Sequence, residues 1–368
     1  MKLDYVVVGA GLFGATIARL LTDLGSRCLV VEQRDHVGGN CATSNREGVV
    51  VHEYGPHIFH TNDRGIWDFV RSYADFTPFV NTPKAVTSRG CFSLPFNMHT
   101  FEEFWGITDP AEAERKIKFD QGYTNPSNAE EKAISMVGRE LYEEFIKGYT
   151  TKQWGRDPKD LPTQIVGRLP VRFTYDNNYY DHKYQGIPTR GYSELIGTLL
   201  SGIEVLLNTD FLLQREYFIN QAKHIVYTGA LDALFDQELG SLAYRSIEFE
   251  LERMPQAQFQ AQAVTNYCSL SVAHTRVTEH KHFNGSSGDA TYITTETPEE
   301  YDGNNIPCYP INDRQNNERY RQYTKLIKRF PTISFGGRLA QYRYLDMDMI
   351  IASAFAKSRK LHARFSEN

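Results

Sequence analysis

The chain has 368 residues, of which 41% are hydrophobic, and a formal net charge of −5. This length holds one large domain or two to three ordinary ones, and the acidic balance argues against a nucleic-acid-binding protein. Five scattered cysteines without a Cys-x-x-Cys pair predict a reduced, cytoplasmic protein with neither a disulfide framework nor a metal site. The chain enters its first strand without space for a signal peptide, and no apolar run has the length of a membrane span, so we expect a soluble protein that does not enter the membrane.

A glycine-rich turn follows the first predicted strand. Leu3–Val8 leads into Gly9-Ala10-Gly11-Leu12-Phe13-Gly14, an amphipathic stretch at Ala15–Leu24 and a second strand at Cys28–Val31. The first glycine allows the tight turn, the second lets the backbone approach a pyrophosphate, and the third lets the helix pack on its strand. Glu32 closes the second strand, where an acidic side chain can accept hydrogen bonds from a ribose. The pattern predicts a dinucleotide-binding unit.

A second glycine pair follows at once, in Gly38-Gly39-Asn40, with Arg34 just before it. Two more glycines would bring additional backbone close to a large ligand. The arrangement resembles the FAD-binding start of glutathione-reductase-like flavoproteins more than a plain NAD domain. An ordinary surface turn is the alternative, and FAD is the preferred interpretation.

The middle of the chain changes character twice. Gln164–Tyr184 is rich in Arg, Tyr and Asn and is predicted to be a loop. In the segment before it, apolar residues recur with a helical period near 3.6. The segment after it consists of short strand-like runs bounded by Gly and polar turns. We expect helices at Phe101–Trp105, Ala111–Phe119 and Glu130–Ile146, and strands at Ala261–Tyr267 and Thr291–Thr295.

Two later segments repeat the opening style of strand, glycine and helix. His224–Thr228 precedes Leu231–Leu239, and Thr332–Phe335 precedes Met347–Lys360. The predicted fold class is therefore α/β, a discontinuous Rossmann-like FAD-binding domain with an inserted small helical domain and an antiparallel β-sheet domain. We assign residues 1–80, 190–240 and 325–368 to the FAD-binding domain, 98–155 to the helical domain, and 81–97, 156–189 and 241–324 to the sheet domain, with a mobile loop near 164–178.

Three further strings stand beside the dinucleotide motif. They are Gly55-Pro56-His57-Ile58-Phe59-His60-Thr61, Lys147-Gly148-Tyr149-Thr150-Thr151-Lys152-Gln153-Trp154-Gly155 and Gly336-Gly337-Arg338-Leu339-Ala340. Together, and in this order, they resemble bacterial UDP-galactopyranose mutases over nearly the whole chain. A stretch around Cys41-Ala42-Thr43 departs from the family by being less aromatic, on the flavin side of the site.

The resemblance implies an isomerase that interconverts UDP-galactopyranose and UDP-galactofuranose and supplies furanose for cell-surface polysaccharide. It implies FAD that is active when reduced and forms a covalent adduct between its N5 and the anomeric carbon of the sugar, without net electron transfer. It also implies an electron donor such as NAD(P)H and a homodimer.

The same resemblance assigns roles to individual residues. Arg168 and Arg276 match arginines that face each other across the cleft, and arginine forks suit a diphosphate. His57 and His60 match a pair beside the flavin ring; two histidines three apart also fit a metal, but no third ligand accompanies them. The substrate-binding candidates are Tyr149, Thr150, Trp154, Phe145, Asn81, Tyr179, Asn266, Tyr309, Tyr344 and Asp346. The cofactor-binding candidates are Gly9, Gly11, Leu12, Phe13, Gly14, Glu32, Gln33, Gly39, Asn40, His57, Arg338 and Met347.

Three alternatives stay open at this point. An FAD-dependent oxidoreductase of the amine-oxidase type shares the opening motif but has no need of two arginines facing a diphosphate. A flavin-stabilised binding protein would lack activity. A related mutase would act on another nucleotide sugar, since a hydroxyl or N-acetyl group is distinguished by only a few side chains.

Overall fold

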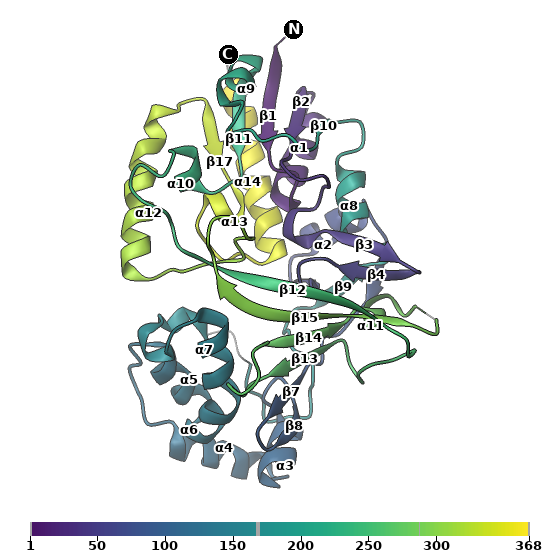
Figure 1. The fold of residues 1–368 in the computed structure, drawn as a ribbon, viewed down its shortest axis with the longest axis vertical. Helices are drawn as coiled ribbons and strands as arrows, with labels where there is room; N and C mark the ends of the chain where they lie inside the picture. Colours follow the sequence, from purple (N-terminus) through teal and green to yellow (C-terminus); the bar gives the residue numbers. More distant parts are fainter. Residues whose placement is uncertain (1, 167–169, 287, 367–368) are drawn as a thin grey trace.

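A computed structural model describes residues 2–166, 170–286 and 288–366 of the chain. Figure 1 shows a parallel sheet with its helices at the top, a long twisted sheet across the middle and a group of helices below. Two buried cores cover the two faces of the parallel sheet and a third lies in the lower helical group. Residues of the two upper layers line the cavity described below.

The parallel sheet carries the dinucleotide motif. Its strands run in the order β10 (Glu204–Leu206), β2 (Cys28–Val31), β1 (Leu3–Val8), β11 (Ala222–Tyr227) and β17 (Ile333–Phe335). Side chains alternate between two cores along β1. Tyr5 and Val7 pack with α1 (Leu12–Asp23), α8 (Tyr192–Leu199) and α14 (Met347–Ser366), whereas Val6 packs on the opposite side. That second face is covered by α9 (Arg215–Gln221), α10 (Leu231–Leu234) and α12 (Arg314–Leu326), and the short α13 (Gly337–Ala340) follows β17.

This arrangement confirms the predicted α/β Rossmann-like fold. The strand predicted near residue 224 is β11, which pairs directly with β1, and the strand predicted near residue 332 is β17, which pairs with β11. The sheet is therefore assembled from segments far apart in the chain. All pairs in the sheet are parallel, so every strand presents its carboxyl end to the same edge, where ligands of such folds bind.

The second sheet has seven strands. Their order is β16 (Tyr309–Pro310), β12 (Tyr244–Met254), β15 (Thr291–Glu300), β14 (Arg276–Glu279), β13 (Val264–Tyr267), β7 (Lys84–Thr87) and β8 (Gly90–Ser93). Neighbours are antiparallel except β13 and β7, which run parallel. Smaller sheets pair β3 (Thr43–Arg46) with β4 (Val49–His52), and β9 (Tyr184–Pro188) with β5 (Phe59–Thr61) and β6 (Phe76–Pro78). The short α2 (Arg64–Arg71) lies between β5 and β6 in the chain, and α11 (Lys281–Asn284) lies between β14 and β15.

The lower group consists of α3 (Met98–Trp105), α4 (Pro110–Asp120), α5 (Ala129–Val137), α6 (Arg139–Leu141), a π-helical turn (Tyr142–Lys147) and α7 (Gly148–Trp154). The prediction of a single helix over Glu130–Ile146 was wrong, because Gly138 has a φ of +82° and ends α5. The helix predicted at Leu231–Leu239 is likewise shorter: α10 stops at Leu234, and Asp236 and Gln237 adopt positive φ. No helix among the described residues is long and apolar enough to cross a membrane.

Candidate active site

A cavity of about 800 Å³ opens at the carboxyl edge of the parallel sheet. Its floor is the turn after β1, where α1 comes so close to the turn that a Cβ on Gly14 would lie 1.9 Å from the Gly9 carbonyl oxygen. The second glycine pair folds back onto this turn, since a Cβ on Gly39 would lie 3.1 Å from the Gly11 Cα. Backbone therefore lines the floor where a pyrophosphate needs it.

Glu32 lies at the end of β2 and is 5% exposed. Its carboxylate accepts hydrogen bonds from the backbone N–H groups of Ala10, at 2.7 Å, and Arg34, at 2.9 Å. Each carboxylate oxygen keeps a lone pair for a further donor such as a ribose hydroxyl. Gln33 and Asn40 line the same end of the cavity, and the Arg34 guanidinium donates to Asn40 and lies over the Tyr54 ring.

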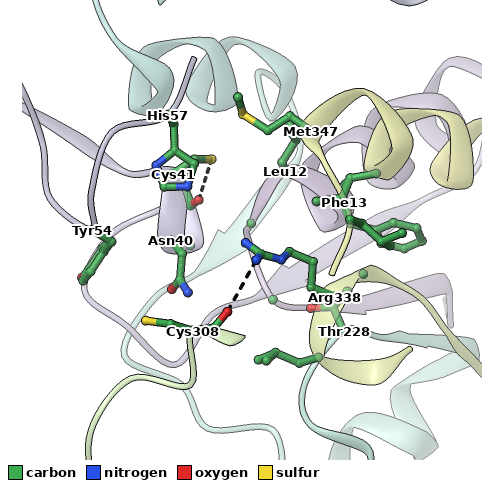
Figure 2. Close-up of a pocket in the computed structure, with 18 of the residues that line it drawn as sticks. Leu12, Phe13, Asn40, Cys41, Tyr54, His57, Thr228, Cys308, Arg338 and Met347 are labelled. Atoms are coloured by element: carbon green, nitrogen blue, oxygen red, sulfur yellow. Dashed lines mark hydrogen bonds between the residues drawn. The ribbon is translucent and has the colours of Figure 1, made fainter. Parts of the chain in front are cut away.

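The lining also includes Leu12, Phe13, His57, Arg338 and Met347, all labelled in Figure 2, where Arg338 reaches into the space between Leu12 and Asn40. Arg338 donates to the Cys308 carbonyl and lies over the Tyr344 ring, at 4.7 Å from its centroid. Within the described residues, Arg338 Nε and Arg34 Nη1 are buried without a hydrogen-bond partner. Two half-buried arginines, each with one buried and unsatisfied donor, on a cavity lined by backbone fit an anionic dinucleotide.

Hydrogen bonds from backbone N–H groups connect three histidines in series, and His57 is the one that lines the cavity. The His57 backbone N–H donates to His52 Nδ1, and the His52 N–H donates to His280 Nδ1. Accepting at Nδ1 puts the proton of His52 and His280 on Nε2, and His280 Nε2 donates to Thr294. Burial lowers the pKa of His57 to about 4 and of His280 to about 3, so this wall of the cavity is uncharged at neutral pH.

Figure 2 also labels Cys41, whose thiol donates to the Gly38 carbonyl. Burial raises the pKa of this thiol to about 12, so it stays protonated in the cavity wall.

Arg276 is the first residue of β14 and lines the cavity. We call the part of the cavity formed by Arg276, Tyr179, Tyr309 and Tyr344 its mouth or rim. It donates to the Tyr149 hydroxyl at 3.1 Å and forms an ion pair with Glu296 at 3.3 Å. Burial opposes its charge, but the Glu296 carboxylate and the Tyr149 phenol raise the pKa of Arg276 above its usual range. Arg276 is therefore a permanent cation on the wall of the cavity that the seven-stranded sheet contributes.

Tyrosines surround this cation. Tyr309 stacks on Tyr344 with ring centroids 5.9 Å apart, and Trp154 lies 6.2 Å from Tyr309. Burial raises the pKa of Tyr179 to about 12 and raises that of Tyr309 further, so both phenols remain hydrogen-bond donors. A rim of one arginine and several phenols suits a diphosphate and an aromatic base.

The structure brings most of the predicted site residues to the cavity. Its lining includes Gly9, Gly11, Leu12, Phe13, Gly14, Glu32, Gln33, Gly39, Asn40, His57, His60, Tyr179, Arg276, Tyr309, Arg338, Tyr344, Asp346 and Met347. Tyr149 and Trp154 reach it through their contacts with Arg276 and Tyr309, and they lie near the two ends of α7.

Four predicted residues lie elsewhere, and a fifth, Arg168, lies outside the described residues. Phe145 is buried in the helical core against Phe92, Phe96 and Phe104, so the structure does not bring it to the cavity. The others are Thr150, buried in α7; Asn81, whose carbonyl accepts from the Tyr179 N–H; and Asn266, which donates to Lys84.

Sequence reasoning missed several lining residues. Glu296 lies in a run of Thr and Glu that carries no signal of its own, and Tyr180 directly follows a predicted residue. His60 stacks on Tyr180 at 3.8 Å, and its Nδ1 lies 2.6 Å from His182 Nδ1. Only the folded chain brings His182, from the segment before β9, to a histidine on β5.

Comparison with known proteins decides the family. The profile described as UDP-galactopyranose mutase matches residues 144–344, and that of an NAD(P)-binding Rossmann-like domain matches residues 7–73. A probable UDP-galactopyranose mutase of Klebsiella pneumoniae is 41% identical over 360 residues, covering 95% of this chain and 92% of the relative. The chain belongs to the UDP-galactopyranose mutase family. This confirms the resemblance drawn from the sequence motifs.

The family contains relatives with different substrates in their names. A dTDP-fucopyranose mutase of Escherichia coli is 39% identical over 360 residues, covering 95% of this chain and 96% of the relative. The crystal structure of a reduced UDP-galactopyranose mutase shares the fold at a TM-score of 0.76 and 14% identity, covering 100% of this chain and 95% of that one. Family and fold indicate an isomerase with a flavin cofactor, and the cavity's unsatisfied buried donors fit such a group.

Proposed function

We propose that the protein interconverts UDP-galactopyranose and UDP-galactofuranose, with FAD as its cofactor, active when reduced. The observation that carries this proposal is the position of Arg276 and Tyr149, which lie hydrogen-bonded to each other at the mouth of a dinucleotide cavity. A plain flavin oxidoreductase needs the floor of the cavity but has no use for an arginine held at this place by a tyrosine and a glutamate.

The residues of the mouth would bind and hold the nucleotide. The Arg276 fork can bind two phosphate oxygens, and Glu296 fixes its orientation from behind. Tyr179 and Tyr309, protonated at physiological pH, would donate to the remaining oxygens. Because the diphosphate is the leaving group and must return, these donors would stabilise it in place between bond breaking and bond making. Arg168 is our candidate for a second arginine on the diphosphate.

The floor of the cavity would hold the FAD. The backbone turn with Glu32 would take its pyrophosphate and ribose, and Arg338 would lie beside the ring system with the beginning of α14. When bound and reduced, the flavin supplies a nucleophile, its N5 lone pair, for the anomeric carbon. A cation at Arg338 favours the anionic reduced ring, while the neutral His57 adds no second charge there.

A second candidate substrate is a dTDP-linked 6-deoxyhexose, because the Escherichia coli dTDP-fucopyranose mutase is nearly as similar to this chain as the Klebsiella pneumoniae relative. Both candidates present a pyrimidine diphosphate to the same rim. They differ at the ribose, at the base methyl group and at the sugar C6. We further propose NAD(P)H as the electron donor and a homodimer as the assembly.

The test is turnover under reducing conditions. The dithionite-reduced protein is incubated with UDP-galactofuranose and, separately, with dTDP-fucofuranose, and the products are separated by chromatography while oxygen and reductant are monitored. We expect pyranose product from the UDP sugar without stoichiometric consumption of reductant. If only the dTDP sugar is turned over, the substrate is the dTDP-linked sugar and not the UDP-linked one. Net oxidation of an amine or alcohol would instead show that the protein is an oxidoreductase.

A further inference from the structure

Lys152 lies on α7 but its ammonium group is held by another element. Its Nζ donates to the backbone carbonyls of Tyr267 at 2.8 Å, Val272 at 2.9 Å and His274 at 2.7 Å. Tyr267 is the last residue of β13, and Val272 and His274 belong to the turn that joins β13 to β14. An ammonium group has three N–H donors and no acceptor, so these carbonyls saturate it.

The turn held by Lys152 leads directly to the substrate rim. His274 is two residues before Arg276, and Tyr267 follows Asn266, which pairs with Arg276 in the β13–β14 register. Lys152 therefore fixes the turn at both of its ends. The position of the Arg276 backbone depends on this anchoring.

A second contact between α7 and β14 is made by Tyr149. Lys152 and Tyr149 are three residues apart on α7 and so share a face of the helix. The Tyr149 hydroxyl accepts from Arg276 at 3.1 Å. The helix and the strand are thus joined twice, once at the turn through Lys152 and once at the rim through Tyr149.

Close packing leaves α7 little freedom to take another position. A Cβ on Gly148 would lie 2.2 Å from the Cys268 carbonyl oxygen, so the start of the helix touches the same turn. Its last carbonyls, of Lys152 and Gln153, accept from the buried Arg245 of β12 at 3.3 and 3.1 Å. Figure 1 shows α7 set against the edge of the long sheet at this point.

We propose that Lys152 is a positioning residue for the nucleotide site: its three hydrogen bonds to the end of β13 and the β13–β14 turn set the spacing between Tyr149 and Arg276. This inference rests on the proposed function in that it takes the Tyr149–Arg276 pair to bind the nucleotide. Burial lowers the pKa of Lys152 to about 8, whereas the three carbonyl oxygens favour its charged form.

The test is a double-mutant cycle on nucleotide affinity. UDP binding to the flavin-loaded protein is measured by calorimetry for wild type, Lys152→Met, Tyr149→Phe and the double variant. We expect Lys152→Met to weaken binding by on the order of tenfold with flavin content unchanged. We expect the double variant to lose less than the product of the single losses, since both act on one spacing. Lys147→Met, on an exposed lysine paired with Glu143 just before α7, is the matched control and should bind UDP like wild type.

Several results would decide against the inference. Unchanged affinity in Lys152→Met, or fully multiplicative losses in the cycle, would reduce Lys152 to a structural residue. If Lys152→Met does not fold, Lys152→Arg carries the test: it retains the charge, cannot converge on three carbonyls in the same space, and should still weaken binding. A wild-type protein that binds neither UDP nor dTDP would refute the proposed function instead; if it binds dTDP alone, the same cycle is measured with dTDP.

Discussion

Acid is expected to destabilise the protein through its buried histidines. Burial lowers the pKa of His280 to about 3 and of His57 to about 4, and holds that of His52 well below its usual range. In the unfolded chain each would titrate near the ordinary value of about 6.5. Below that pH the unfolded state binds more protons, so stability that is present above pH 6.5 falls as the pH drops toward the folded values.

The size of the effect follows from the two pKa values. For His280, which is fully buried, the free energy of unfolding should fall by about 2 kcal/mol between pH 7 and pH 5. His57 is only half-buried and should contribute less. Since a domain is stable by only about 5–15 kcal/mol, the loss is a large fraction of the total.

Urea unfolding at pH 7 and pH 5, with saturating flavin, measures this loss. His280→Asn keeps an acceptor for the His52 N–H but removes the titrating ring, so its stability should depend on pH less steeply by about 2 kcal/mol over this range. The control is Thr294→Val, which removes the partner of His280 Nε2 and should lower stability at both pH values alike. A wild-type protein equally stable at both pH values, or a His280→Asn variant as pH-sensitive as wild type, would refute the reasoning.

Three further predictions concern the site. Arg276→Ala should lower turnover by some thirty- to several-thousandfold, which corresponds to about 2–5 kcal/mol, with the flavin content unchanged. Arg276→Lys should restore little activity, because a point charge cannot replace the guanidinium fork. Steady-state kinetics together with flavin absorbance measure both effects. Gly14→Ala should lose flavin, since its Cβ would meet the Gly9 carbonyl, whereas Gly197→Ala in α8, where nothing lies within 4 Å, should retain it; absorbance after gel filtration distinguishes them. Turnover should require reduced flavin yet consume none of the reductant, which anaerobic assays with limiting dithionite measure, and full activity of the oxidised protein would contradict this.

The dinucleotide half of the site could be predicted from the sequence because its determinants are local. The turn at Gly9–Gly14, the acidic residue ending β2 and the glycine pair at Gly38 lie within one short segment. Such spacings restrict the backbone directly, so the pattern is visible without knowing what packs around it. The family was predicted correctly for a related reason, since several separated motifs kept their order.

The other half depends on contacts between distant segments, and no local pattern encodes them. Glu296 reaches Arg276 across neighbouring strands, and His182 meets His60 over 122 residues of chain. Helix lengths failed where a single backbone conformation overrides periodicity, as at Gly138. The roles assigned to individual residues, and the boundaries of the three domains, stay predictions.

The two halves of the cavity also explain why the fold alone does not determine the reaction. A putative protoporphyrinogen oxidase from Exiguobacterium and a cyclohexylamine oxidase share the fold with TM-scores of 0.68 and 0.62, at 13% identity each. The likeness extends over 99% and 100% of this chain, respectively, so one fold carries proteins with differently named activities. Under the proposed function, the reaction depends on the side chains that the second sheet and α7 contribute to the cavity: Arg276, Tyr149 and the surrounding phenols. These groups would offer positive charge and hydrogen bonds to an anionic leaving group, which a transferase acting on a nucleotide sugar requires and an amine oxidase does not. Variants of the rim should therefore abolish sugar isomerisation while the flavin still binds and is still reduced, and variants of the floor should abolish all three together.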